Sequence, residues 1–170
     1  MIPRLLLILS LLAVAVWCQA GGKPSRIYAV TFHLEGDEKD NPKFNVPVKL
    51  GQESRQYIFS KIPTFTDNDV SWFYPFTAAD GISFGAAFKF KEHAAQELKG
   101  VTLTNQGKLL GIRAADAPIQ AVLIDRPIDD GVVVIWSGLT QSHLEKFQKE
   151  FPHVDDFKPK NKPATEMPQR

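Results

Sequence analysis

Alternating apolar and polar positions dominate the chain between residues 28 and 61. The stretch 28–34 places an apolar side chain at every second position, which is the period of a β-strand. The stretch 44–50 alternates in the same way, and 56–61 predicts a third, shorter strand. We expect the first two to be neighbouring strands, joined by the charged loop 36–43. Pro47 cannot donate to a ladder, so its strand should lie at an edge.

The second half of the chain combines further strands with two helices. Alternation resumes over 84–90, and 91–99 predicts a helix that Gly100 ends. A second helix begins after Thr140 and has its large apolar residues on one face. Between the helices are three short apolar runs, over 108–113, 119–124 and 132–136.

This order of elements predicts an α+β fold. Strands, one helix, more strands and a last helix do not form the regular alternation of a doubly wound sheet. We expect a mainly antiparallel sheet with the two helices packed on one face. The β-rich N-terminal part would cover 21–82 and an α+β subdomain 83–152. The proline-rich, charged tail 153–170 should be disordered.

The first twenty residues have the pattern of a secretory signal peptide. An almost wholly apolar run is too short to span a membrane comfortably, and small residues permit cleavage after Ala20. Lipidation of Cys18 is the alternative, but the bulky Trp17 precedes that cysteine. We therefore expect an extracytoplasmic protein, periplasmic or secreted, with no transmembrane helix in the mature chain.

Charge and cysteine content narrow the function classes. The chain has 20 Lys and Arg against 19 Asp and Glu, so it lacks the basic excess that nucleic-acid binding requires. Cleavage after Ala20 would remove one of those 20 cations, Arg4, and leave a net charge of zero. It would also remove the only cysteine, Cys18, so the mature domain would have no disulfide.

No motif predicts a metal or another cofactor. The four histidines form no HExxH pattern, and we expect His33 and Glu35 to lie on a solvated strand face. Asp67, Asp69 and Ser71 have the spacing of the first calcium ligands of an EF-hand loop. The bidentate glutamate that such a loop needs is replaced by Ala78, and capping of a turn explains the carboxylates instead.

Ser83 is the one candidate nucleophile. It stands in Gly81-Ile82-Ser83-Phe84-Gly85, which matches the five-residue pattern of a nucleophile elbow. That elbow requires a strand before the serine and a helix after it, whereas here a turn precedes and a strand follows. A small exported serine hydrolase is therefore kept only as an alternative.

The aromatic run 72–76 is the candidate binding surface. Neighbouring side chains of a strand point to opposite faces, so these aromatics cannot all enter one core. Exposure as a binding surface and burial under another element both remain open. Trp136, at the end of a later strand, is expected in the core. The candidate binding residues are Trp72, Phe73, Tyr74 and Phe76.

The stretch Phe84–Phe151 resembles the head of the first periplasmic domain of SecD, the accessory subunit of the Sec protein-export machinery. A looser similarity extends upstream over 63–70. The segment 113–116 departs from the family, which has an Asp-Gly hairpin there. The similar segments are Phe84-Gly85-Ala86-Ala87-Phe88-Lys89-Phe90, Asn105-Gln106-Gly107-Lys108, Ala117-Pro118-Ile119 and Ile135-Trp136-Ser137-Gly138-Leu139-Thr140.

The resemblance implies a stand-alone copy of a head domain that contacts exported polypeptide. It does not imply translocase activity, because no transmembrane segment of the SecD type follows the head in this sequence. The leading hypothesis is thus a non-enzymatic binding domain for polypeptide or an envelope partner. A third hypothesis is a structural envelope protein whose tail, 158–170, binds acidic polymer. The oligomeric state is not predicted.

Overall fold

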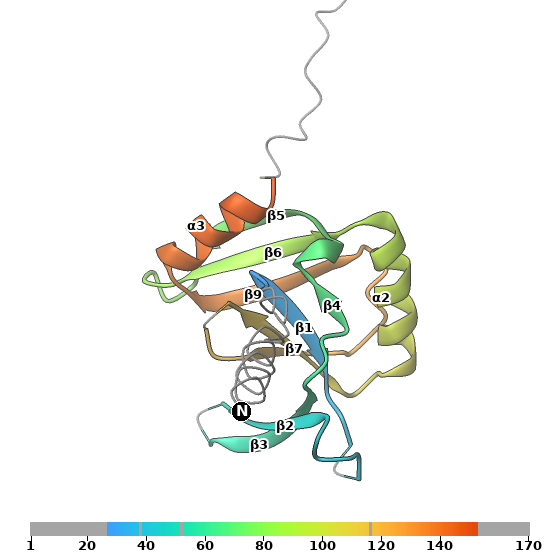
Figure 1. The fold of residues 1–170 in the computed structure, drawn as a ribbon. Helices are drawn as coiled ribbons and strands as arrows, with labels where there is room; N and C mark the ends of the chain where they lie inside the picture. Colours follow the sequence, from blue (N-terminus) through green and yellow to red (C-terminus); the bar gives the residue numbers. More distant parts are fainter. Residues whose placement is uncertain (1–26, 38, 52, 116, 153–170) are drawn as a thin grey trace, which may run out of the picture.

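The computed structural model describes residues 27–152 except positions 38, 52 and 116 (Figure 1). The signal peptide predicted over 1–20, including Cys18, and the tail predicted over 153–170 lie outside these residues. The described part is an α+β fold in which every strand pair is antiparallel, as predicted. Its elements are β1 Val30–Leu34, β2 Asn45–Leu50, β3 Arg55–Ser60, β4 Phe65–Thr66, the 3-10 turn η1 Asp67–Asp69, β5 Val70–Thr77, β6 Phe84–Phe90, α2 Glu92–Thr104, β7 Leu109–Ala114, β8 Gln120–Leu123, β9 Val132–Leu139 and α3 Gln141–Glu150.

The strands form three sheets, with orders β4-β1-β7-β8, β5-β6-β9 and β2-β3. The prediction that β1 and β2 are neighbours was wrong, because β1 pairs with β4 and β7 on its two sides. β2 pairs with β3 alone among the described strands, which leaves Pro47 at an edge as predicted. Strands from before and after residue 82 share both larger sheets, since β1 pairs with β7 and β5 with β6.

The core lies between the two larger sheets and is rich in phenylalanine. Phe32 of β1 packs against Phe90 of β6 with ring centroids 4.9 Å apart, and against Phe88 at 6.0 Å. Helix α3 adds Phe147, whose ring centroid lies 5.2 Å from that of Phe88. These residues belong to one continuous cluster of buried side chains to which α2 contributes Leu98.

Helix α2 is longer than its pattern predicted. It passes through Gly100 and ends before Asn105, so the predicted stop at Gly100 was wrong. The reason is tertiary: Leu98 and Thr102, on either side of Gly100, are both fully buried and hold the helix against the sheet. Burial of this kind outweighs the roughly 1 kcal/mol that glycine costs inside a helix.

The β2-β3 hairpin covers the other face of the four-stranded sheet. Phe59 of β3 is fully buried over Gly111 of β7, where an added Cβ would meet its ring at 2.7 Å. His33 of β1 is buried beneath the same hairpin, and its Nδ1 hydrogen-bonds to the carbonyl of Ser60 at 2.8 Å. The expectation of a solvated face at His33 was therefore wrong, because the hairpin folds back over it.

Candidate functional site

Exposed and half-buried aromatic side chains lie together on the outer face of the β5-β6-β9 sheet. Phe73 pairs with Phe88 and faces the core, so alternation turns its neighbours Trp72 and Tyr74 to the opposite face. Tyr74 is 47% exposed. On β9, Trp136 is 69% exposed although its neighbour in the chain is buried. The outer face therefore combines aromatics from the two edge strands of this sheet.

Glycine at position 85 allows two of these rings to meet across the middle strand. Phe76 of β5 and Trp136 of β9 have ring centroids 6.1 Å apart in an edge-to-face arrangement. Gly85 of β6 lies beneath the Phe76 ring, and a Cβ there would be 2.4 Å from that ring and 2.7 Å from the Ile135 carbonyl. Edge-to-face pairs at such distances are favourable for aromatic rings.

The structure divides the four predicted binding residues. Trp72, Tyr74 and Phe76 share the outer face. Phe73 is 0% exposed instead, and its ring centroid lies 5.8 Å from that of Phe147. Phe73 is a core residue because it stands opposite Phe88 in the ladder, so it is unavailable to a ligand. The prediction of a buried Trp136 was also wrong. An alternation of apolar and polar residues would have indicated that Trp136 faces outward, but the run 132–136 is wholly apolar and shows no such alternation.

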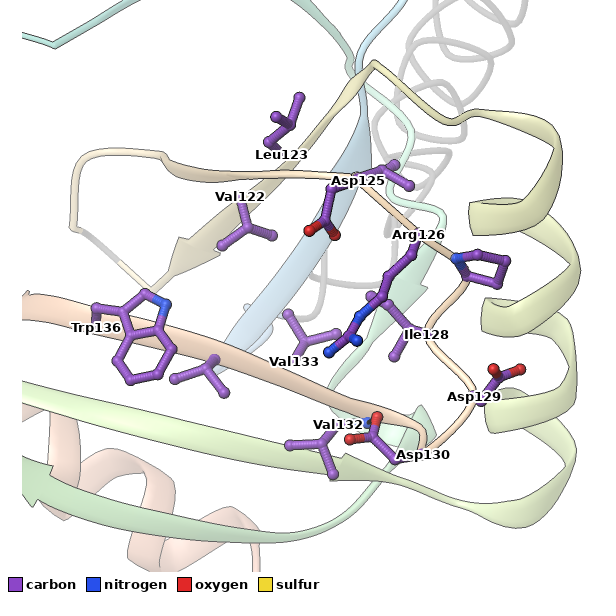
Figure 2. Close-up of a pocket in the computed structure, with 13 residues that line it drawn as sticks. Val122, Leu123, Asp125, Arg126, Ile128, Asp129, Asp130, Val132, Val133 and Trp136 are labelled. Atoms are coloured by element: carbon purple, nitrogen blue, oxygen red, sulfur yellow. Dashed lines mark hydrogen bonds between the residues drawn. The ribbon is translucent and has the colours of Figure 1, made fainter.

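A groove runs between the edge strands β8 and β9 and encloses about 400 Å³. Figure 2 shows Val122 and Leu123 on one side and Val132, Val133 and Trp136 on the other. The loop from β8 to β9 closes one end and contributes charged side chains, which are Asp125, Arg126, Asp129 and Asp130. Trp136 thus belongs both to this groove and to the aromatic face.

Side chains bind the β9 backbone at the two ends of the groove. At one end, the Gln120 amide donates to the Ser137 carbonyl at 2.6 Å. At the other, the Val132 N–H donates to the Asp130 carboxylate at 3.0 Å. The main chain of β9 therefore uses side-chain groups at positions where a neighbouring strand would normally supply hydrogen bonds.

The hydrogen bonds of Ser83 indicate that its hydroxyl stabilises a turn. Its hydroxyl donates to the Asp80 carboxylate at 2.5 Å and accepts from the Gly138 N–H at 2.9 Å. The hydrogen bond from Ser83 is the main cause that lowers the pKa of the exposed Asp80 carboxyl. A carboxylate of lowered pKa is a weak general base. The partner of Ser83 is thus poorly suited to activate a nucleophile.

The acidic residues after β4 have structural contacts that need no metal. Asp69 accepts from the Thr66 N–H at 2.8 Å, and Asp67 accepts from the Ala29 N–H at 2.9 Å. This confirms the capping interpretation for Asp69, whereas Asp67 connects the turn to the residue before β1. Within the described residues, no three His, Cys, Asp or Glu side chains are grouped so that they could hold a metal.

Comparison with solved structures shows which known proteins have a similar fold. No protein-family model matches the chain, and no curated protein matches it either. A solved structure of SecDF, described as a membrane component that enhances protein export, matches with a TM-score of 0.50 at 17% identity over 71% of this chain. A crystal structure of SecDF in a super-membrane-facing form matches with a TM-score of 0.51 at 16% identity over 74%.

The chain has a SecDF-like fold. This confirms the structural side of the resemblance to SecD seen in the sequence. The match spans 60% of the first SecDF chain and 19% of the second. Across the part of this chain that the structure describes, no helix is long and apolar enough to cross a membrane. In this fold the aromatic face lies on the outer face of the β5-β6-β9 sheet, and the groove follows the β9 edge of that sheet, opposite β8.

Proposed function

We propose that this SecDF-like chain is an exported, non-enzymatic domain that binds polypeptide through the aromatic face. That face consists of Trp72, Tyr74, Phe76 and Trp136. The observation that carries the proposal is the 69% exposure of Trp136, held edge-to-face against Phe76 instead of in the core. Tryptophan and tyrosine are, with arginine, the side chains most often found to dominate the binding energy of protein interfaces.

The fold supports an extracytoplasmic role in handling polypeptide. SecDF is described as enhancing protein export, and the amino-terminal pattern of this chain predicts export as well. A client in transit is unfolded and exposes apolar side chains, for which an aromatic surface has affinity. The turn contacts of Ser83 disfavour the hydrolase alternative. The tail 158–170 of the structural alternative lies outside the described residues.

The test compares two exposed aromatics on different faces. Trp136→Ala removes the centre of the proposed surface, whereas Phe44→Ala removes an aromatic that is 56% exposed beside the β2-β3 hairpin. Binding of a fluorescent, carboxymethylated and permanently unfolded polypeptide is measured by anisotropy. We expect Trp136→Ala to weaken binding about tenfold or more, as for a central aromatic contact, and Phe44→Ala to leave it unchanged.

Equal binding by Trp136→Ala and the wild-type protein would contradict the proposed surface. Circular dichroism of both variants serves as the check on folding. Since both side chains are largely exposed, neither substitution should alter the spectrum.

A further inference from the structure

The free edge of β9 has main-chain groups that point into the groove. β9 pairs with β6 on one side only among the described strands. The Phe90 N–H donates to the Gly131 carbonyl at 2.9 Å, and these residues stand opposite each other. Hydrogen bonding alternates along an antiparallel pair. The N–H and C=O groups of Val132 and Val134 are therefore directed away from β6.

At both ends of this edge, side-chain groups form the hydrogen bonds to the main chain that a neighbouring strand would otherwise form. Asp130 takes the outward N–H of Val132, and the Gln120 amide supplies an N–H to the Ser137 carbonyl. A side-chain amide donates through an amide N–H, as a peptide group does. Between these two contacts, the outward groups of Val134 have no hydrogen-bond partner within the part of the chain that the structure describes.

The opposite wall of the groove is also the unpaired edge of a strand. β8 is the last strand of the four-stranded sheet and pairs with β7 alone among the described strands. The Ile124 N–H donates to the Lys108 carbonyl, so alternation from this pair directs the main-chain groups of Ala121 and Leu123 away from β7. The groove is thus bordered by two strand edges rather than by two side-chain surfaces.

We propose that an extended polypeptide segment adds as a strand to the edge of β9 within this groove. The inference rests on the proposed function and specifies how the polypeptide is held. Main-chain hydrogen bonds to the Val132 carbonyl and to the N–H and carbonyl of Val134 would provide the affinity, as in other cases of strand addition. The side chains of Val134 and Trp136 would contact every second residue of the segment.

The size and charge of the groove fit such an occupant. The edge from Val132 to Trp136 is about 13 Å long at the rise of a strand, which matches four or five extended residues. Two of the acidic residues near its loop end have a lysine beside them: Lys99 pairs with the Asp129 carboxylate at 2.9 Å, and the Lys89 ammonium contacts the main-chain carbonyl of Asp130. The exposed Asp125 and Arg126 are opposite in sign. The groove therefore attracts neither polyanions nor polycations and suits uncharged segments of varied sequence.

Val134→Pro tests the main-chain contact directly. Proline removes the N–H that points into the groove, but this N–H takes no part in the ladder with β6. Val134→Ala is the matched control, since it shortens the side chain and keeps the N–H. The probe is the fluorescent peptide Lys-Thr-Val-Thr-Val-Thr-Val-Lys. We expect Val134→Pro to bind it at least tenfold more weakly than Val134→Ala does, and equal affinities would overturn the proposal.

A second measurement leaves the protein unchanged and alters the probe. In a depsipeptide version, ester oxygens replace the N–H groups of the central residues, while the side chains and the extended chain are retained. Strand addition predicts at least tenfold weaker binding of this probe to the wild-type protein. Equal binding of the two probes would overturn the proposal even if Val134→Pro failed to fold.

The two proposals fail in different ways. If the wild-type protein bound neither the peptide nor the unfolded polypeptide, the proposed function and the strand addition would both be wrong. If binding occurred and Trp136→Ala weakened it, but Val134→Pro and the depsipeptide had no effect, the aromatic face would remain and strand addition alone would be excluded.

Discussion

His33 illustrates how one buried polar side chain is satisfied between two sheets. Its Nδ1 hydrogen-bonds to the Ser60 carbonyl and its Nε2 to the Thr31 hydroxyl, both at 2.8 Å. Desolvation by burial lowers the pKa of His33 below its ordinary value of 6.5, and the nearby Arg113 adds to this effect. The neutral imidazole therefore joins the hairpin to the four-stranded sheet.

Acidification should destabilise the protein through His33. Below pH 6.5 the unfolded chain takes up a proton at this histidine that the folded protein resists, so the free energy of unfolding falls as the pH drops towards the lowered pKa. We expect His33→Gln to reduce this pH dependence. Urea unfolding at pH 7.5, 6.5 and 5.5 measures it. The exposed His93 provides the control, and an equal loss of pH dependence in His93→Gln would contradict the assignment.

At the scale of elements, periodicity predicted most of the strands and both helices. It succeeded where side chains alternate between a buried and a polar face, as in β6, and where an apolar stripe repeats, as in α3. It failed at Gly100, where local propensity indicates a helix stop but the flanking residues are buried against the sheet. Local rules cannot include that distant burial.

Replacing Gly100 by alanine should stabilise α2. The position lies inside the helix, and an added Cβ would meet nothing within 4 Å. We expect a gain of about 0.5–1 kcal/mol in the free energy of unfolding, from the helix propensities of the two residues. Thermal unfolding followed by circular dichroism measures the change.

Gly131→Ala is the contrasting variant for that experiment. Gly131 has a φ of 62°, and its added Cβ would lie 2.7 Å from the Cβ of Ala95. This variant should lose stability, because alanine disfavours the left-handed region and the helix blocks the extra methyl. A lower melting temperature for Gly100→Ala than for the wild-type protein would refute the account of α2.

At the scale of the whole molecule, the hairpin β2-β3 is a layer of its own outside the main core. Phe59 is fully buried but packs over Gly111, on the side of the four-stranded sheet away from the phenylalanine cluster. Figure 1 shows this hairpin at the opposite end of the molecule from α3. The aromatic face and the β9 wall of the groove belong to the other sheet, and only the β8 wall belongs to the sheet that the hairpin covers.

Phe59→Ala should therefore loosen the hairpin before the rest of the fold. Truncating a buried phenylalanine costs about 3–5 kcal/mol, and here the lost contacts are those between the hairpin and β7. Hydrogen exchange resolved by residue should show faster exchange in β2 and β3 while β5, β6 and β9 keep their protection. Equal acceleration in all three sheets would show instead that the molecule unfolds as one cooperative unit.

For the candidate site, the sequence predicted the aromatic stretch but not its division between faces. Alternation required that Phe73 and its neighbours point in opposite directions. Only the pairing of Phe73 with Phe88, and the packing of α3 on that side, decided which direction is the core. Trp136 was missed because consecutive apolar residues fit a strand buried on both faces as well as a strand with one open face.

The sequence by itself determined the α+β class, most of the strands and helices, and the resemblance to SecD, because these follow from local periodicity and short motifs. The tertiary structure decided which strands pair and which faces remain open. β1 and β7 are separated by more than half of the described chain, yet they pair across five positions. Such pairings depend on how much apolar surface distant segments bury together, a free energy that no local pattern contains.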